Sequence, residues 1–146
     1  MAWPAIGKAF TPAEFEAYVD GLTWTDAFRP DGIVLHATSS PCLANRPNGF
    51  TQQQMVNFES YYKNECGWNG GPHLFIDDRA IWVFNDLTKR GTHSPSFNAS
   101  RFGIEMLGDY DKEEFNSGRG RKVRDNTVAA MAILNNRLGF AADAFK

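Results

Sequence analysis

The stretch Gly32-Ile33-Val34-Leu35-His36-Ala37-Thr38 decides the fold of this chain. Its aliphatic and β-branched residues predict a strand over residues 32–37 that is buried on both faces, as strands are in the parallel sheets of α/β proteins. His36 lies at the exit of that strand. A polar ring that closes an apolar run is a candidate for function, and its role depends on which other side chains reach it.

Helices and strands alternate on both sides of this stretch. Capping residues and apolar spacing predict three helices, which run from residue 12 to about 20, from 52 to about 66, and from about 121 to Gly139. Two aromatic and β-branched runs, 74–76 and 80–84, flank the turn residues 77–79 and predict a hairpin. A further strand is expected over residues 102–107. This alternation predicts an α/β fold in a single domain, residues 1–146.

Composition excludes several classes of protein. The chain has 146 residues, a net charge of -2 and a pI near 5.9, which gives no electrostatic reason to expect nucleic-acid binding. No stretch approaches the roughly 18 apolar residues of a membrane span, and no signal peptide is expected, so we predict synthesis in the cytoplasm. The basic stretch 119–124 is interpreted as a solvated loop at the start of a helix. Cys42 and Cys66 leave room for one optional disulfide.

Three histidines and one glutamate carry the chemistry that the residues alone suggest. His36, His73 and His93 are each ordinary polar residues when taken singly, because no H-E-x-x-H or paired C-x-x-C spacing accompanies them. Glu105 lies between two apolar residues of its strand. It either points to solvent or faces a cleft, and in an apolar cleft its pKa would rise and suit it to proton transfer.

Four segments, taken in order, resemble the type 2 N-acetylmuramoyl-L-alanine amidases, which include phage endolysins and the animal peptidoglycan recognition proteins. They are residues 33–38 with His36, 65–76 with a Cys-Gly-Trp run, 91–98 with His93, and 102–108 with Glu105. The resemblance covers about residues 30–139. It implies a central mixed β-sheet flanked by helices, and hydrolysis of the amide between N-acetylmuramic acid and L-alanine of peptidoglycan.

The resemblance also implies roles for individual residues. His36 matches the first ligand of a catalytic zinc ion. His93 matches a cleft histidine beside the metal that is not usually a ligand, and it is expected to contact substrate with Asn98 and Thr38 as neighbours. Glu105 matches a strand glutamate that some members use in proton transfer. His73 is expected to be a structural residue of the sheet.

Two departures from the family pattern affect this interpretation. Pro72 stands where many members have a cleft tyrosine, so any role of that tyrosine passes to Glu105 or is lost. Members of the family also continue past the last helix into a segment with a second ligand histidine, a lysine, and a cysteine or aspartate. This sequence ends at Lys146, so by the family pattern only one zinc ligand, His36, is identified and the others are not.

Three alternatives therefore stay open. The first is a zinc-dependent peptidoglycan hydrolase whose sequence is shortened here, acting at the cell wall or periplasm. The second is a non-catalytic amidase-fold protein that binds muropeptides or a protein partner. In the third, His36, His73 and His93 converge on one metal and restore the enzyme. A sheet surface left uncovered by a missing segment would also favour a homodimer.

Overall fold

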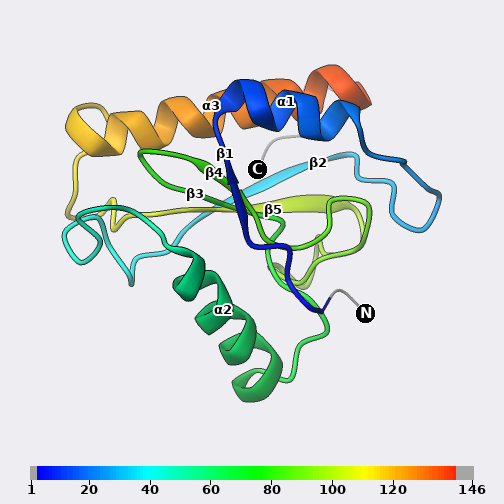
Figure 1. Cartoon of the computed structure of the whole chain (residues 1–146), viewed down its shortest axis with the longest axis horizontal. Coiled ribbons are helices and arrows are strands. Elements are labelled where there is room, and N and C mark those ends of the chain that lie inside the picture. The colour runs from blue at the N-terminus through cyan, green and yellow to red at the C-terminus, as the bar shows by residue number, and fades with distance from the viewer. Residues whose placement is uncertain (1–2, 141–146) are drawn as a thin grey trace.

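A five-stranded mixed sheet lies between two layers of helices in the computed structural model, which describes residues 3–140 (Figure 1). The strand order is β1-β4-β3-β5-β2; β1 pairs with β4 and β4 with β3 in antiparallel fashion, whereas β3–β5 and β5–β2 are parallel. The strands are β1 (Lys8–Phe10), β2 (Gly32–Ala37), β3 (Leu74–Ile76), β4 (Ile81–Val83) and β5 (Arg101–Met106). The predicted mixed sheet flanked by helices is confirmed.

Helices cover both faces of this sheet. In Figure 1, α1 (Pro12–Asp20) and α3 (Gly118–Leu138) lie side by side across one face. On the other side lies α2 (Gln52–Ser60), which continues into a π-helical turn, η1 (Tyr61–Glu65). The predicted starts of α1 and α2 are confirmed, because Thr11 forms a complete capping box and the Thr51 hydroxyl accepts from the Gln54 amide at 3.1 Å. The second helix was predicted to run to about residue 66, but its regular part ends at Ser60.

Three features differ from the sequence predictions. Strand β1 was not predicted, because three residues are too few to show an alternation of apolar and polar side chains. They form a strand only by pairing with β4. Helix α3 begins at Gly118, three residues before the predicted Arg121. Strand β2 is the edge of the sheet, and burial on both faces holds only for its first half: Ile33 and Val34 are buried, whereas His36 is half-buried.

Strand register assigns the side chains to faces. Residues paired directly across neighbouring strands point to the same face. Leu35, Ile104 and Leu74 are such partners, and they point to the face opposite that of His36, Glu105 and Phe75, which are partners one residue further along. Phe58 of α2 stacks on Phe75 with ring centroids 4.5 Å apart. The row containing His36 and Glu105 therefore lies on the α2 face of the sheet.

The basic stretch 119–124 lies at the start of α3, as expected, and Arg121 and Lys122 are exposed, but it is helical and Arg119 is a half-buried structural clamp. Its guanidinium donates to both carboxylate oxygens of Asp78 at 2.9 and 3.0 Å, and to the carbonyl oxygens of Leu43 and Arg46 at 2.8 and 2.6 Å. It ties α3 to the turn between β3 and β4 and to the loop 38–50. The optional disulfide is not formed either, because Cys42 and Cys66 are both free thiols.

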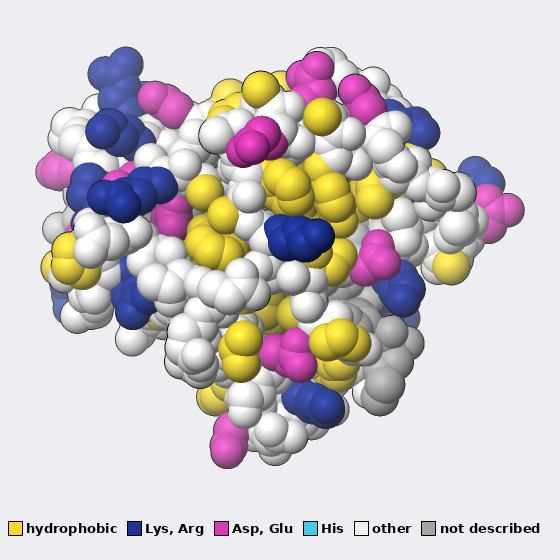
Figure 2. Space-filling view, in the orientation of Figure 1, with side chains coloured by type: hydrophobic (Ala, Val, Ile, Leu, Met, Phe, Trp, Pro, Cys, Tyr) yellow, Lys and Arg dark blue, Asp and Glu magenta, His cyan; other side chains and the backbone are white. Residues whose placement is uncertain are grey.

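The surface facing the viewer in Figure 1 mixes hydrophobic, acidic and basic side chains, and no histidine is visible on it (Figure 2). Within residues 3–140, none of the helices is long and apolar enough to cross a lipid bilayer.

Candidate functional site

His36 and Glu105 lie side by side near the carboxyl ends of two parallel strands. They are register partners on β2 and β5, and both are half-buried on the α2 face. Parallel pairing forces this proximity, since it puts the exits of both strands at one edge of the sheet. An imidazole and a carboxyl group from separate segments of sequence are thereby brought together at one edge of the sheet.

His93 approaches the same site from the loop between β4 and β5. Its Nδ1 lies 3.2 Å from Nε2 of His36, and its Nε2 lies 3.1 Å from the carbonyl oxygen of Arg101. A carbonyl only accepts, so His93 carries its proton on Nε2, and its Nδ1 then accepts from Nε2–H of His36. The ring packs over Gly103 of β5, where a Cβ would lie only 2.6 Å from its Nδ1.

Asn98 and Thr38 are both in this region, but their polar atoms hold the backbone. The side-chain oxygen of Asn98 accepts from the amides of His93 and Ser94, each at 2.8 Å. The Thr38 hydroxyl donates to the carbonyl oxygen of Pro41 at 2.7 Å and accepts from the amide of Gly108 at 3.1 Å. In this structure Asn98 positions His93, and Thr38 joins the loops that follow β2 and β5.

His73 is a structural residue, as predicted. It is fully buried and stacks on Phe28 with ring centroids 5.2 Å apart. Its Nε2 donates to the carbonyl oxygen of Lys89 at 2.8 Å, and its Nδ1 accepts from the Gly103 amide at 3.1 Å. Both ring nitrogens are engaged, so His73 offers no lone pair to a metal. The alternative in which all three histidines share one metal is therefore wrong.

Burial sets the protonation of the site. It lowers the pKa of His36, and it lowers the pKa of His93 to about 4, with the nearby charge of His36 acting in the same direction. Burial raises the pKa of Glu105 to about 7 from its ordinary value of 4.5. Near neutral pH both imidazoles are neutral and Glu105 can exist with or without its proton. Neutral imidazoles suit metal ligation, and such a carboxyl suits proton transfer.

An aromatic wall beside Glu105 was not identified as functional from sequence. Tyr62 of η1 stacks on Trp68 with ring centroids 5.1 Å apart, and the charge of Glu105 adds to burial in raising the pKa of the Tyr62 phenol. The Trp68 amide bonds to the Tyr62 carbonyl oxygen at 2.9 Å, across the π-helical turn. Such π-helical turns are common at functional sites but have no sequence signature. The only sequence signal for this wall is the presence of two nearby aromatic residues, Tyr62 and Trp68.

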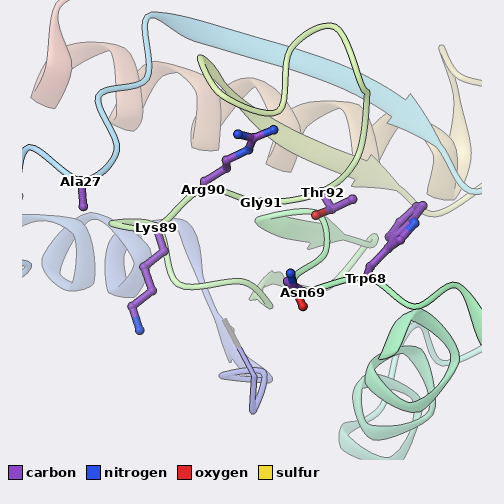
Figure 3. Close-up of a pocket in the computed structure, with 7 residues that line it drawn as sticks. All are labelled: Ala27, Trp68, Asn69, Lys89, Arg90, Gly91 and Thr92. Carbon is purple, nitrogen blue, oxygen red and sulfur yellow. The ribbon is translucent and has the colours of Figure 1, made fainter. Parts of the chain in front are cut away.

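A cavity of about 480 Å³ opens next to this wall (Figure 3). It is lined by Trp68 and by residues that precede His93 in the loop, and the full lining is Ala27, Trp68, Asn69, Lys89, Arg90, Gly91 and Thr92. Figure 3 shows Trp68, Asn69 and Thr92 gathered at one end, with Lys89 and Ala27 at the other. An aromatic face, an amide, a hydroxyl and two cations suit a polar ligand that carries a carboxylate.

Metal ligation can be judged from the donors present. Within the part of the chain that the structure describes, no three side chains of the metal-ligating types come together. His36 still fits a metal ion, because its imidazole is neutral near neutral pH, is half-buried, and projects beside Glu105 at the strand exits. No ready-made cluster among residues 3–140 supplies the other ligands that a metal ion on His36 would need.

The helix-covered mixed sheet, with histidine and glutamate at the exits of its parallel strands, defines an amidase-type α/β domain. Residues 26–139 match the sequence model of the Amidase_2 family, N-acetylmuramoyl-L-alanine amidase, and the chain belongs to this family.

Individual relatives agree with this assignment. Peptidoglycan-recognition protein 1 from Holotrichia diomphalia is 28% identical over 80 residues, which are 53% of this chain and 40% of that protein. The matched stretch thus spans less than half the length of this relative. Among solved structures, the endolysin N-acetylmuramoyl-L-alanine amidase LysCS from Clostridium intestinale superposes with a TM-score of 0.61 at 25% identity, covering 82% of this chain and 73% of that one. The Drosophila protein PGRP-LB gives 0.64 at 20% identity, covering 86% and 75%, which shows the shared fold.

Proposed function

We propose that this chain is the peptidoglycan-cleaving part of an N-acetylmuramoyl-L-alanine amidase that acts at the cell wall or periplasm. The observation that carries the proposal is the pairing of His36 with Glu105, whose pKa is about 7, at the strand exits of an amidase-family domain. The substrate would be the amide that joins N-acetylmuramic acid to L-alanine.

The reaction needs a water molecule to add to the carbonyl carbon and the C–N bond to break. Glu105 can accept a proton from that water and deliver it to the leaving nitrogen, because its pKa lies near the working pH. The products are the lactyl carboxylate and the free amino group of L-alanine. His36 would hold zinc, which when bound polarises the carbonyl and activates water.

The cavity beside Trp68 would hold the peptide stem. Stem peptides end in carboxylates, and Lys89 and Arg90 present two exposed cations at the cavity. Trp68 offers an apolar surface for aliphatic parts of the stem. Asn69 and Thr92 can bond its amide groups. Gly91 and Thr92 of the cavity directly precede His93, which contacts His36, so a stem bound in this cavity would lie next to the site.

A second candidate is a muropeptide-binding domain without hydrolysis. It is favoured by one observation, that no three metal-ligating side chains converge among residues 3–140. Such a domain would use the same cavity and would retain a stem peptide without cleaving it.

One experiment separates these two functions. Purified chain is incubated with peptidoglycan in the presence of zinc, and new amino-terminal L-alanine is quantified together with binding of a soluble muropeptide. The hydrolase releases L-alanine-linked peptides, and Glu105→Gln lowers release by roughly 100-fold or more while leaving muropeptide binding within about two-fold. Binding without any release would leave only the second candidate.

A further inference from the structure

We infer that Trp3 is a positioning residue for stem binding, because its indole N–H holds the peptide group between Trp68 and Asn69 at the wall of the cavity. It belongs to residues 3–6, the segment before β1, which we call the strap. The inference rests on the proposed function in one respect, that this cavity binds the peptide stem. It goes further by assigning a role to the strap, and it is measured by binding alone.

A hydrogen bond ties the strap to the cavity wall. Nε1–H of Trp3 donates to the carbonyl oxygen of Trp68 at 2.8 Å, although the two residues are 65 positions apart in the chain. In Figure 1 the blue chain before β1 runs beside the green loop that follows η1. The bond is partly buried, and in such surroundings a hydrogen bond is stronger than in bulk water.

Two further bonds hold the strap itself. The Ala5 amide donates to the carboxylate of Glu59 on α2 at 2.5 Å. The Ile6 amide donates to the carbonyl oxygen of Phe84, just after β4, at 2.8 Å. The strap is thus anchored to both the helix and the sheet, and Trp3 reaches the cavity wall from a segment that is itself fixed.

Ring contacts close a circuit around the same bond. Trp3 packs edge-on against Phe84 with ring centroids 5.9 Å apart. Phe84 packs edge-on against Tyr62 at 6.0 Å, and Tyr62 stacks on Trp68 at 5.1 Å. Each of these four residues therefore contacts two of the others. Trp68 is held at its ring by Tyr62 and at its carbonyl oxygen by Trp3.

The segment that Trp3 holds has little intrinsic preference for one conformation. Three of the five residues 67–71 are glycines, and glycine loses the most conformational entropy when it is ordered. Gly67 has a φ of +68°, and a Cβ on it would meet no atom within 4 Å, so packing does not restrain it. The conformation of the segment is therefore set by bonds from outside, at the Trp68 amide, the Trp68 carbonyl and the Gly71 amide.

The Trp3 bond fixes the part of this segment that faces the cavity. A peptide group is planar, so holding the carbonyl of Trp68 also sets the direction of the Asn69 amide. Both residues line the cavity, and Figure 3 shows them at the same end of it as Thr92. Without the Trp3 bond this peptide group gains freedom to rotate, and stem binding would have to order it.

The test is calorimetric titration of the chain with a soluble N-acetylmuramoyl tripeptide, with a chelator present to prevent zinc-dependent cleavage. Trp3→Phe keeps an aromatic ring against Phe84 and removes the N–H donor. We expect its Kd to be roughly five-fold above that of the parent, which is the effect of one lost hydrogen bond. Trp82→Phe is the matched control, because the indole N–H of Trp82 has no hydrogen-bond partner among the described residues. It should bind within about two-fold of the parent.

A second readout uses the parent chain and needs no variant. If the Trp3 bond favours the conformation that binds the stem, stem binding must strengthen the Trp3 bond in return. Saturating tripeptide should therefore shift the proton NMR signal of the Trp3 indole N–H downfield, as a strengthened hydrogen bond does. The indole signal of Trp82 should stay in place, which separates positioning from a general change in packing.

The outcomes separate this inference from the proposed function. An unchanged Kd for Trp3→Phe, equal weakening by Trp82→Phe, or an unmoved Trp3 signal would overturn the inference and leave the proposed function standing. A parent chain that binds no tripeptide would overturn the stem cavity and the inference with it. Binding that behaves as expected, without any release of L-alanine from peptidoglycan, would reject hydrolysis and support the inference. Circular dichroism checks that both variants fold.

Discussion

Replacing Glu105 with glutamine is expected to remove a pH-dependent loss of stability. Burial raises the pKa of this carboxyl from 4.5 to about 7 in the folded chain. The folded state therefore binds more protons than the unfolded state between these values, and its stability falls as pH rises through that window. The contribution is fully present below about pH 4.5 and is lost above about pH 7.

The magnitude follows from the change in pKa. Each pKa unit corresponds to about 1.4 kcal/mol, so the change from 4.5 to about 7 corresponds to roughly 3 kcal/mol. Glu105 is partly exposed, and screening by water reduces this to about 2 kcal/mol. The free energy of unfolding of Glu105→Gln, relative to the parent, should therefore rise by about 2 kcal/mol between about pH 5 and pH 8.

Urea unfolding of both proteins, with a chelator present, measures this difference directly. The lowered pKa values of the histidines change stability in the opposite direction, but they are common to both proteins and cancel in the difference. If the free energy of unfolding changed with pH in the same way for both proteins, the raised pKa of Glu105 and the proton-transfer role built on it would be refuted.

Three further predictions follow from contacts of other residues. Gly103→Ala should displace the ring of His93 and cost roughly 1–3 kcal/mol by overpacking, read as a lowered midpoint of thermal unfolding; an unchanged midpoint would contradict the close approach. Arg119→Ala should destabilise the chain by about 2 kcal/mol in urea unfolding, and adding Asp78→Ala should cost little more, because the two share one ion pair; additive losses would show that the pair is not coupled. Trp68→Ala should weaken muropeptide binding by roughly ten-fold in calorimetry without changing zinc affinity; equal binding would exclude the cavity as the stem site.

Local signals explain why most of the fold was predictable. The capping box at Thr11, the N-cap at Thr51 and the left-handed Gly139 after α3 are short-range features, and each acts where the sequence indicates. The edge position of β2 was not predictable, because a buried first half of a strand has the same pattern as a central strand. Lys8–Phe10 became a strand only through its long-range partner β4.

The site was predictable only in part, for a similar reason. His36, Glu105 and His93 were selected from sequence, and parallel pairing with a loop contact brings all three to one place. The engagement of both nitrogens of His73 depends on Lys89 and Gly103, which are distant in sequence. The cavity beside Trp68 is likewise formed by three separate segments, so no local sequence pattern predicts it.

The Arg119 clamp bears on how the loop after His36 moves. This loop also has its Leu43 and Ala44 amides bonded at 3.0 Å to the carboxylate of Glu113, and its Phe50 amide bonded at 2.7 Å to Asp77. Segments held by shared bonds open together, so hydrogen exchange of these amides should report one common opening free energy, shared with the first turn of α3. A loop without helix or strand would then behave as one cooperative unit with the amino-terminal turn of a helix.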